Sequence, residues 1–228
     1  MKVGILVTGR VAPELLPEFG EYDVIFQEFL GGRGYDHASW FIVDGEMPDS
    51  PDDADGWLIT GSKHGAYEDH DWIKPLEDFI RDVRDANKPL VGICFGHQII
   101  AQALGGKVEK FEGGWAAGRQ TYDFDGSEMS LNAWHQDQVV ELPEGATVLA
   151  KNDFCKYAAL SYGDRIFTVQ PHPEFQSRHV KGLLDIRAPG VVPDAIIKQA
   201  NSDLDKPLAN TLLADMIADV FAKAGTHE

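Results

Sequence analysis

The first half of the chain alternates short apolar runs with amphipathic stretches. Short apolar runs are typical of strands, and the nearly continuous runs GILV and PLVGIC are typical of strands that are covered on both faces. Such strands belong to the interior of a sheet. The predicted strands of this half are Lys2–Thr8, Val24–Phe29, Ser39–Val43, Trp57–Thr60 and Pro89–Cys94.

Two amphipathic stretches flank the last of these strands. In Asp71–Asn87 the apolar residues recur at helical spacing, and Asp71 is the expected N-cap. Phe95–Leu104 predicts a second helix, which Gly105 and Gly106 end. This alternation of strands and helices predicts an α/β fold with a mainly parallel central sheet and helices on both faces.

The second half has a different pattern, in which short alternating stretches are separated by turn signals such as Asp125-Gly126. This pattern predicts an antiparallel extension at the edge of the sheet. The tail Lys206–Ala224 has helical spacing and is expected to pack on the sheet. No repeat or linker divides the sequence, so we expect residues 1–228 to form one domain. The predicted strands here are Arg119–Phe124, Gln138–Glu141, Thr147–Lys151, Tyr157–Ser161 and Arg165–Val169.

Composition narrows the class of protein. The 228 residues are 43% hydrophobic, which is enough for a buried core, and the formal net charge is −17. A negative field repels phosphate backbones, so a nucleic-acid partner is not expected. No apolar run approaches the roughly 18 residues of a membrane span, and the first run is too short for a signal peptide. We therefore expect a cytoplasmic protein in which Cys94 and Cys155 are free thiols.

The strongest chemical signal is the junction of an apolar strand and a helix at Cys94. Gly92 and Gly96, two residues before and after it, permit a sharp turn. This is the layout of a nucleophile elbow with sulfur in place of oxygen, and the N-terminus of the following helix favours a thiolate. The amide of Phe95 would face an oxyanion formed on a carbonyl that Cys94 attacks. The alternative is a buried structural cysteine.

A second signal is the segment Gln170-Pro171-His172-Pro173-Glu174. A thiolate nucleophile needs an imidazole to take and return its proton, and the imidazole needs a carboxylate to orient it. The two prolines forbid a central strand, so His172 and Glu174 are expected on a rigid loop at a strand end, where active sites of parallel sheets lie. A solvated loop with an incidental histidine is the alternative. A metal site is not expected, because Cys94, His135, His172 and Glu174 match no zinc spacing.

A third signal is the glycine that follows the strand at Leu58–Thr60. The amide of Gly61 can approach a ligand closely and supply a second oxyanion donor. A simple turn between strand and loop is the alternative interpretation.

These motifs together resemble a known family. The stretches GICFGHQ and QPHPEF resemble class I glutamine amidotransferase domains, which carry a Cys-His-Glu triad. ITGSKHGAYED and WHQDQV are similar to stretches of the glutaminase domain of GMP synthase and its stand-alone relatives. The resemblance runs from about Asp55 to Phe175. It implies a flavodoxin-like three-layer fold and cleavage of the γ-carboxamide of glutamine, or of a γ-glutamyl amide, through a thioester on the cysteine.

The resemblance also implies roles for individual residues. Cys94 would be the nucleophile, His172 the general base and acid, and Glu174 the residue that orients the histidine. The amides of Gly61 and Phe95 would form the oxyanion hole. His97 is interpreted as structural. The implied substrate-binding residues are Gln98, His135, Gln136 and Asp137. The chain departs from the family at Gln136, where a glycine is frequent, and at Ile59-Thr60-Gly61, where many relatives have G-G-P.

Several motifs are missing from the sequence. There is no S-G-G-x-D-S loop, no P-loop and no G-x-G-x-x-G after a strand, so no cofactor is expected and activation of an acceptor would need a separate synthetase subunit. A γ-glutamyl-amine or γ-glutamyl-peptide hydrolase, a non-catalytic binding module and a thiol peptidase of the same fold stay open as alternatives. The glycine-rich segment 31–37 is either a surface loop or a border of the Cys94 pocket that meets the leaving group.

Overall fold

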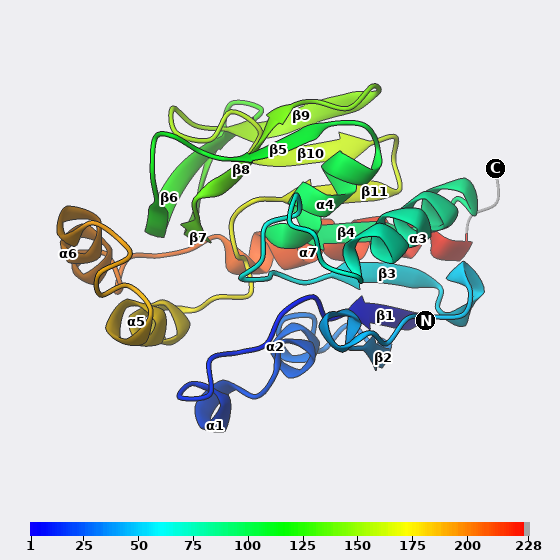
Figure 1. Ribbon diagram of the computed structural model, residues 1–228, viewed down its shortest axis with the longest axis horizontal. Coiled ribbons are helices and arrows are strands. Elements are labelled where there is room, and N and C mark those ends of the chain that lie inside the picture. The colour runs from blue at the N-terminus through cyan, green and yellow to red at the C-terminus, as the bar shows by residue number, and fades with distance from the viewer. Residues whose placement is uncertain (226–228) are drawn as a thin grey trace.

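A computed structural model describes residues 1–225 of the protein. Within these residues the central sheet has nine strands in the order β2-β1-β3-β4-β11-β10-β9-β6-β7. The first five are parallel, and they cross the middle of the molecule in Figure 1 with their carboxyl ends at one edge. These are β2 (Asp36–Trp40), β1 (Lys2–Leu6), β3 (Gly56–Ile59), β4 (Leu90–Ile93) and β11 (Ile166–Val169).

The other strands confirm the predicted antiparallel extension, which lies above the parallel strands in Figure 1. In it, β6 and β7 form a hairpin whose two turn residues, Asp125 and Gly126, both have positive φ (48° and 86°), as a tight type I′ turn requires. A separate two-stranded ribbon pairs β5 with β8. The bounds are β5 (Lys107–Lys110), β6 (Ala116–Phe124), β7 (Ser127–His135), β8 (Asp137–Glu141), β9 (Ala146–Lys151) and β10 (Ala159–Tyr162).

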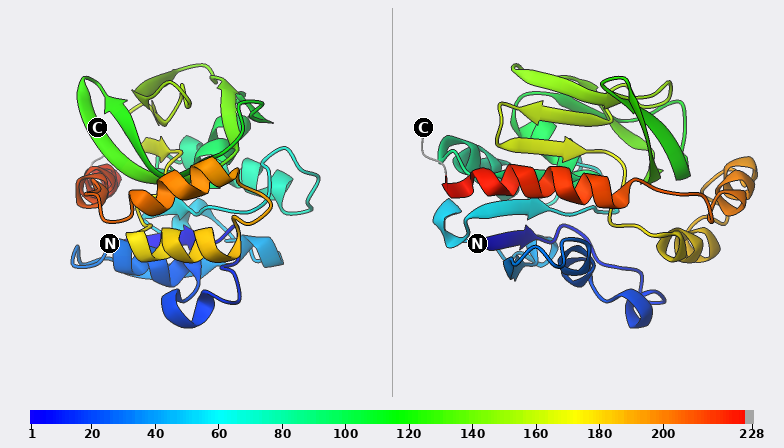
Figure 2. Two further views of the ribbon diagram at one scale, coloured as in Figure 1. Left: turned by 90° about the vertical axis from the view of Figure 1, so that its left-hand side faces the viewer. Right: turned by 180° about the vertical axis from the view of Figure 1, so that it is seen from behind.

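Helices cover both faces of the sheet, which confirms the three-layer α/β architecture (Figure 2). Apolar side chains of α3 (Ile73–Asp85) and α4 (Phe95–Ala103) share one hydrophobic cluster with Trp57 and Ile59 of β3. Those of α2 (Tyr22–Phe29) and α7 (Asn210–Phe221) share the other cluster with strands β1, β4 and β11. The remaining helices are α1 (Leu16–Phe19), α5 (Ser177–Ile186), α6 (Asp194–Ser202) and the 3-10 turns Ile42–Asp44, Pro51–Asp53 and Ala222–Gly225.

Four expectations about individual elements were wrong. The stretch Arg165–Val169, predicted in the antiparallel edge extension, forms β11, which lies within the sheet and is parallel to β4. Val24–Phe29 lies in helix α2 and not in a strand, because a short apolar run fits either element and here Phe26 packs on the sheet while Ile25 packs against Leu15 and Phe19. The edge strand begins at Asp36, three residues before the predicted start, and ends at Trp40. Helix α3 begins at Ile73 after Trp72, so Asp71 is not its N-cap.

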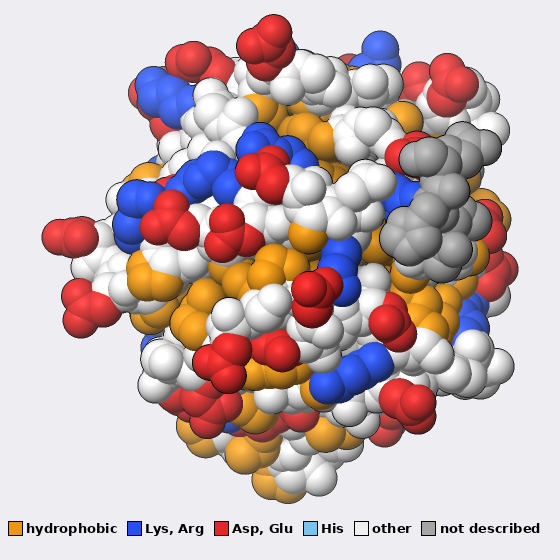
Figure 3. Space-filling model, turned by 90° about the vertical axis from the view of Figure 1, so that its right-hand side faces the viewer, with side chains coloured by type: hydrophobic (Ala, Val, Ile, Leu, Met, Phe, Trp, Pro, Cys, Tyr) orange, Lys and Arg blue, Asp and Glu red, His pale blue; other side chains and the backbone are white. Residues whose placement is uncertain are grey.

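The face at the amino ends of the parallel strands carries acidic and basic side chains interspersed with apolar ones (Figure 3). The acidic surplus of the sequence is therefore spread here and not gathered into one patch. Among residues 1–225, no helix is both long enough and apolar enough to span a bilayer.

Candidate active site

The turn between β4 and α4 presents Cys94 at the carboxyl edge of the parallel sheet. Cys94 has φ 53° and ψ −102°, a conformation that non-glycine residues rarely adopt. A Cβ on Gly92 would lie 2.5 Å from the carbonyl oxygen of Gly96, and a Cβ on Gly96 would lie 2.3 Å from that of Ile59. Both glycines are therefore needed for strand and helix to approach this closely, as expected for a nucleophile elbow.

His172 and Glu174 follow β11 on the neighbouring strand end. Nδ1–H of His172 donates to Oε1 of Glu174 over 2.6 Å, and both side chains are buried. The amide of His172 donates to the carbonyl of Asn132 on β7 at 2.8 Å, and its ring stacks on Phe175 with centroids 4.2 Å apart. Because Nδ1 is committed to the carboxylate, Nε2 is left to face a second group.

The electrostatics of this pair favour a charged imidazole. Burial alone would lower the pKa of His172, but the charges of Glu174 and Cys94, with a hydrogen bond to each, raise it to about 10. An imidazolium beside the sulfur stabilises a thiolate. Gln170 adds a neutral donor, since its Nε2 lies 3.7 Å from Cys94 Sγ.

The turn after β3 brings Gly61 against both groups. A Cβ on Gly61 would lie 3.0 Å from Cε1 of His172 and 3.8 Å from Cβ of Cys94. The turn is held by Thr8, whose hydroxyl donates to the carbonyl of Thr60 at 2.9 Å and whose amide donates to the Thr60 hydroxyl at 3.0 Å. The structure thus brings Gly61 beside the nucleophile and the imidazole.

A cleft of about 250 Å³ opens at Cys94. One wall is the segment 62–68 after β3, and the other is the end of β7 with the residues that follow it. The predicted substrate-binding residues all line this cleft. The full lining is Ser62, Lys63, His64, Gly65, Tyr67, Glu68, Cys94, Gln98, Lys110, Trp115, Trp134, His135, Gln136 and Asp137.

The side chain of Gln98, predicted to bind substrate, forms hydrogen bonds within the protein. Its Nε2 donates to the carbonyl of Asp137 at 2.8 Å and to Oε1 of Gln170 at 3.1 Å, so both amide protons are used. The second bond turns Nε2 of Gln170 toward the sulfur of Cys94. Gln98 therefore positions its neighbours and offers a ligand only its oxygen.

The other three predicted residues form one side of the cleft. His135 is buried, and burial together with the charge of His172 lowers its pKa to about 3, so it is neutral. Nε2 of Gln136 donates to the carbonyl of Phe111 at 3.4 Å. Asp137 accepts from the hydroxyl of Tyr67 at 3.2 Å, and burial raises the pKa of its carboxyl.

Some residues of the site were missed by sequence reasoning. The indoles of Trp115 and Trp134, with centroids 6.1 Å apart, form an aromatic wall of the cleft. Trp134 stands next to His135 in WHQDQV and could have been found, whereas Trp115 follows a glycine pair that carries no pattern. Thr8 gave no signal either, because its role depends on β1 and β3 being neighbours.

Two other expectations can be compared with the structure. His97 is wholly buried, and its Nδ1 lies 2.8 Å from the hydroxyl of Thr168, so it stands in the core outside the cleft. The segment 31–37 does not border the Cys94 cleft: it leads into the amino end of β2, and its Arg33 lines a different pocket together with Pro173 and Glu174. Its Tyr35 packs on Phe221, and Arg33 pairs with Asp215 of α7.

The chain is similar to known proteins over this whole region. Residues 45–184 match the family described as glutamine amidotransferase class-I. Gamma-glutamyl peptidase 4 of Arabidopsis thaliana is 33% identical over 90% of this chain and 88% of its own length. GMP synthase of Vibrio vulnificus is 32% identical over 60% of this chain and 27% of its own length.

The fold is shared with solved structures. A glutamine amido transferase from Methylobacillus flagellatus superposes with a TM-score of 0.76 at 22% identity, covering 100% of this chain and 96% of that one. A glutamine amidotransferase from Thermotoga maritima superposes with a TM-score of 0.71 at 19% identity, covering 97% of each. These structures support the flavodoxin-like fold. The family match and the similarity to gamma-glutamyl peptidase 4 show that the chain is a hydrolase of the glutamine amidotransferase type and belongs to the class-I glutamine amidotransferase family.

Proposed function

We propose that this chain is a cysteine-dependent hydrolase that cleaves γ-glutamyl amides, and that residues 1–228 act as one domain. The observation that carries the proposal is the His172 imidazole, held by Glu174 at 2.6 Å and hydrogen bonded to Cys94 at the foot of the cleft. A nucleophile, a base and an orienting carboxylate in this order can split an amide through a covalent intermediate.

In the first half-reaction, the Cys94 thiolate attacks the γ-carbonyl carbon and forms a C–S bond. The negative charge on the carbonyl oxygen is stabilised by the amides of Gly61 and Phe95. His172 then gives its Nε2 proton to the leaving nitrogen, the C–N bond breaks, and an amine or ammonia departs. A γ-glutamyl thioester remains on Cys94.

In the second half-reaction, water attacks the thioester. His172, now neutral, takes a proton from the water. The amides of Gly61 and Phe95 stabilise the resulting tetrahedral oxyanion, as in the first half-reaction. The C–S bond breaks, glutamate is released and the thiolate is restored beside the imidazolium. Glu174 accepts from Nδ1–H and so holds the ring in the tautomer with a proton on Nδ1.

The charged end of the γ-glutamyl group has matching partners in the cleft. The carboxylate of Asp137 can take the α-amino group, and Lys110 can take the α-carboxylate, since both line the cleft. His135 and Gln136 supply backbone groups on the same wall. This arrangement supports recognition of a free α-amino acid end.

The aromatic wall bears on the choice of leaving group. Ammonia needs no apolar surface, whereas an amino acid or a larger amine would bury its side chain against Trp115 and Trp134. The similarity to gamma-glutamyl peptidases extends over 90% of the chain. We therefore favour γ-glutamyl peptides or γ-glutamyl amines over glutamine as substrates.

A glutaminase that supplies ammonia to a separate synthetase subunit is the second candidate. It is supported by the similarity to GMP synthase, which covers 60% of this chain, and by the lack of ATP-binding loops in the sequence. In that case the chain alone should hydrolyse glutamine poorly, and the rate should rise on complex formation.

Kinetics on the isolated chain separate the two candidates. We expect kcat/KM for a γ-glutamyl dipeptide to exceed that for glutamine by about tenfold or more. Trp134→Ala should narrow this preference and leave the glutamine rate nearly unchanged. Tyr35→Ala, which removes an aromatic ring outside the cleft, is the matched control and should keep the preference. A preference for glutamine, or equal effects of both substitutions, would favour the second candidate.

A further inference from the structure

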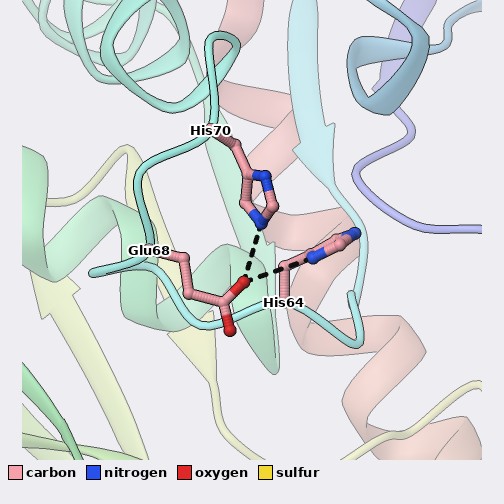
Figure 4. Close-up of side chains that lie close together, drawn as sticks. All are labelled: His64, Glu68 and His70. Atoms are coloured by element: carbon pink, nitrogen blue, oxygen red, sulfur yellow. Dashed lines mark hydrogen bonds and ion pairs between the residues drawn. The ribbon is translucent and has the colours of Figure 1, made fainter.

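A second cluster of reactive side chains lies at the rim of the cleft. His64, Glu68 and His70 stand on the loop between β3 and α3 and point toward one another (Figure 4). Nδ1 of His64 and Nε2 of His70 lie 3.3 Å and 2.7 Å from the same carboxylate oxygen of Glu68. Among residues 1–225, this is the group whose potential metal-ligand atoms all lie within 4.8 Å of one another.

These separations are close to those of ligands around one metal ion. Zinc binds nitrogen and carboxylate oxygen at roughly 2.0–2.2 Å, so the corners of a tetrahedral site lie roughly 3.4 Å apart. The two nitrogen–oxygen separations, 3.3 Å and 2.7 Å, fall near this value, and the two ring nitrogens lie within 4.8 Å of one another. Rotations of the three side chains would turn their ligand atoms toward a shared ion. Two imidazoles and one carboxylate form a ligand set that binds zinc in preference to magnesium or calcium.

The surroundings hold the ligands in place and leave them accessible. The His70 ring stacks on Trp72 with an interplanar angle of 5°, and the amide of His64 donates to the Ser62 hydroxyl at 3.1 Å. The side chains of His64, Glu68 and His70 are 21%, 42% and 34% exposed, so an ion can enter from solvent.

We propose that His64, Glu68 and His70 form a three-ligand zinc site whose fourth position is open at the rim of the cleft. His64 and Glu68 also line the cleft itself. A bound ion therefore ties the wall formed by residues 62–68 to His70 beside it, across the cleft from Trp134. The site is separate from Cys94 and His172, and it does not depend on the function proposed above.

Zinc binding is best measured in a Cys94→Ala background, because the Cys94 thiol is itself a strong zinc ligand. Calorimetric titration with zinc chloride should give one ion per chain with a Kd below about 10 µM, as for a three-ligand site. Adding Glu68→Gln or His70→Asn should weaken binding by about 100-fold, because a ligand is lost.

Asp69→Asn is the matched control. It removes the same charge as Glu68→Gln from the same exposed loop but leaves the three ligands in place. Zinc should raise the thermal unfolding midpoint of the Cys94→Ala chain with and without Asp69→Asn, and should not raise it with Glu68→Gln. A Kd above about 10 µM in the Cys94→Ala chain, or equal losses from Glu68→Gln and Asp69→Asn, would overturn the proposal.

Discussion

The two cysteines occupy regions that differ in almost everything except burial. Both are free thiols within the same hydrophobic cluster. Cys94 stands on a turn with positive φ, at a cleft and beside a charged imidazole. Cys155 stands in a turn, where its backbone amide donates a hydrogen bond to Oδ1 of Asn152 at 2.7 Å. Burial raises the pKa of the Cys155 thiol to about 12. Backbone placement and the neighbouring base, more than residue type or exposure, distinguish a candidate nucleophile from a packing residue.

Removing each sulfur in turn tests whether Cys94, and not Cys155, is the nucleophile. Cys94→Ala should lower kcat by about 10⁴-fold or more, because no covalent intermediate can form. Cys155→Ala should stay within a few-fold of the parent and lose only packing stability. Steady-state rates with a γ-glutamyl dipeptide, together with thermal unfolding, measure both effects. Similar losses from the two changes would contradict the assignment.

The next effect concerns the carboxylate that distinguishes the Cys94 region. Glu174→Gln should lower kcat by about 10²- to 10⁴-fold while the fold is kept, because a neutral amide no longer stabilises the imidazolium. His172→Ala should be at least as damaging, since it removes the base. If Glu174→Ala kept full activity while His172→Ala was inactive, catalysis would need only Cys94 and His172, and the role assigned to Glu174 would be wrong.

A substitution at Gly61 tests how closely the His172 ring must be positioned, and it changes no titratable residue. In Gly61→Ala the new Cβ would lie 3.0 Å from Cε1 of His172, so the ring must shift by a few tenths of an ångström. We expect kcat to fall by about tenfold, because small misplacements of catalytic groups are costly. The thermal unfolding midpoint should change little. An unchanged kcat would show that the imidazole has more room than its contacts indicate.

The smallest expected effect concerns two buried histidines, His97 and His172, whose pKa values are shifted in opposite directions. The pKa of buried His97 is lowered to about 3 by burial and by His135, whereas that of buried His172 is raised to about 10. Because the pKa of His97 in the fold lies below the ordinary histidine value of 6.5, its contribution to stability is present above pH 6.5 and is lost as the pH falls toward 3.

His97→Gln tests this sign. Between pH 6.5 and pH 5, the wild-type unfolding free energy should fall by about 1–2 kcal/mol more than that of the variant. Urea unfolding at both pH values gives the difference. Parallel pH profiles would mean that His97 is not held neutral in the fold.

Much of this arrangement could be predicted from sequence because it depends on local patterns. Gly92 and Gly96 permit a sharp turn and the prolines around His172 restrict the backbone, and both signals can be recognised from the local sequence alone. The parallel strands β1, β3 and β4 were found because they are covered on both faces, so their side chains form apolar runs. The implied roles of Cys94, His172 and Glu174 stay predictions, although the structure brings the three side chains together.

Other parts depend on contacts between distant segments and gave no local signal. The apolar run at Val24–Phe29 is too short for its period to separate helix from strand. Strand β7 is an exception: it was missed although the turn Asp125-Gly126 before it was recognised and Met129, Leu131 and Ala133 alternate with Ser130 and Asn132. The bonds of Gln98 to Asp137 and Gln170 join residues 39 and 72 positions apart. No periodicity along the chain predicts such pairs.

Trapping of the covalent intermediate tests the central claim most directly. The isolated chain is mixed with a γ-glutamyl dipeptide, quenched in acid within the first turnovers, digested and analysed by mass spectrometry. The account predicts a γ-glutamyl adduct on the peptide that contains Cys94, with the peptide that contains Cys155 unmodified, and no adduct in Cys94→Ala. Turnover without any adduct on Cys94, or an adduct on Cys155, would contradict it.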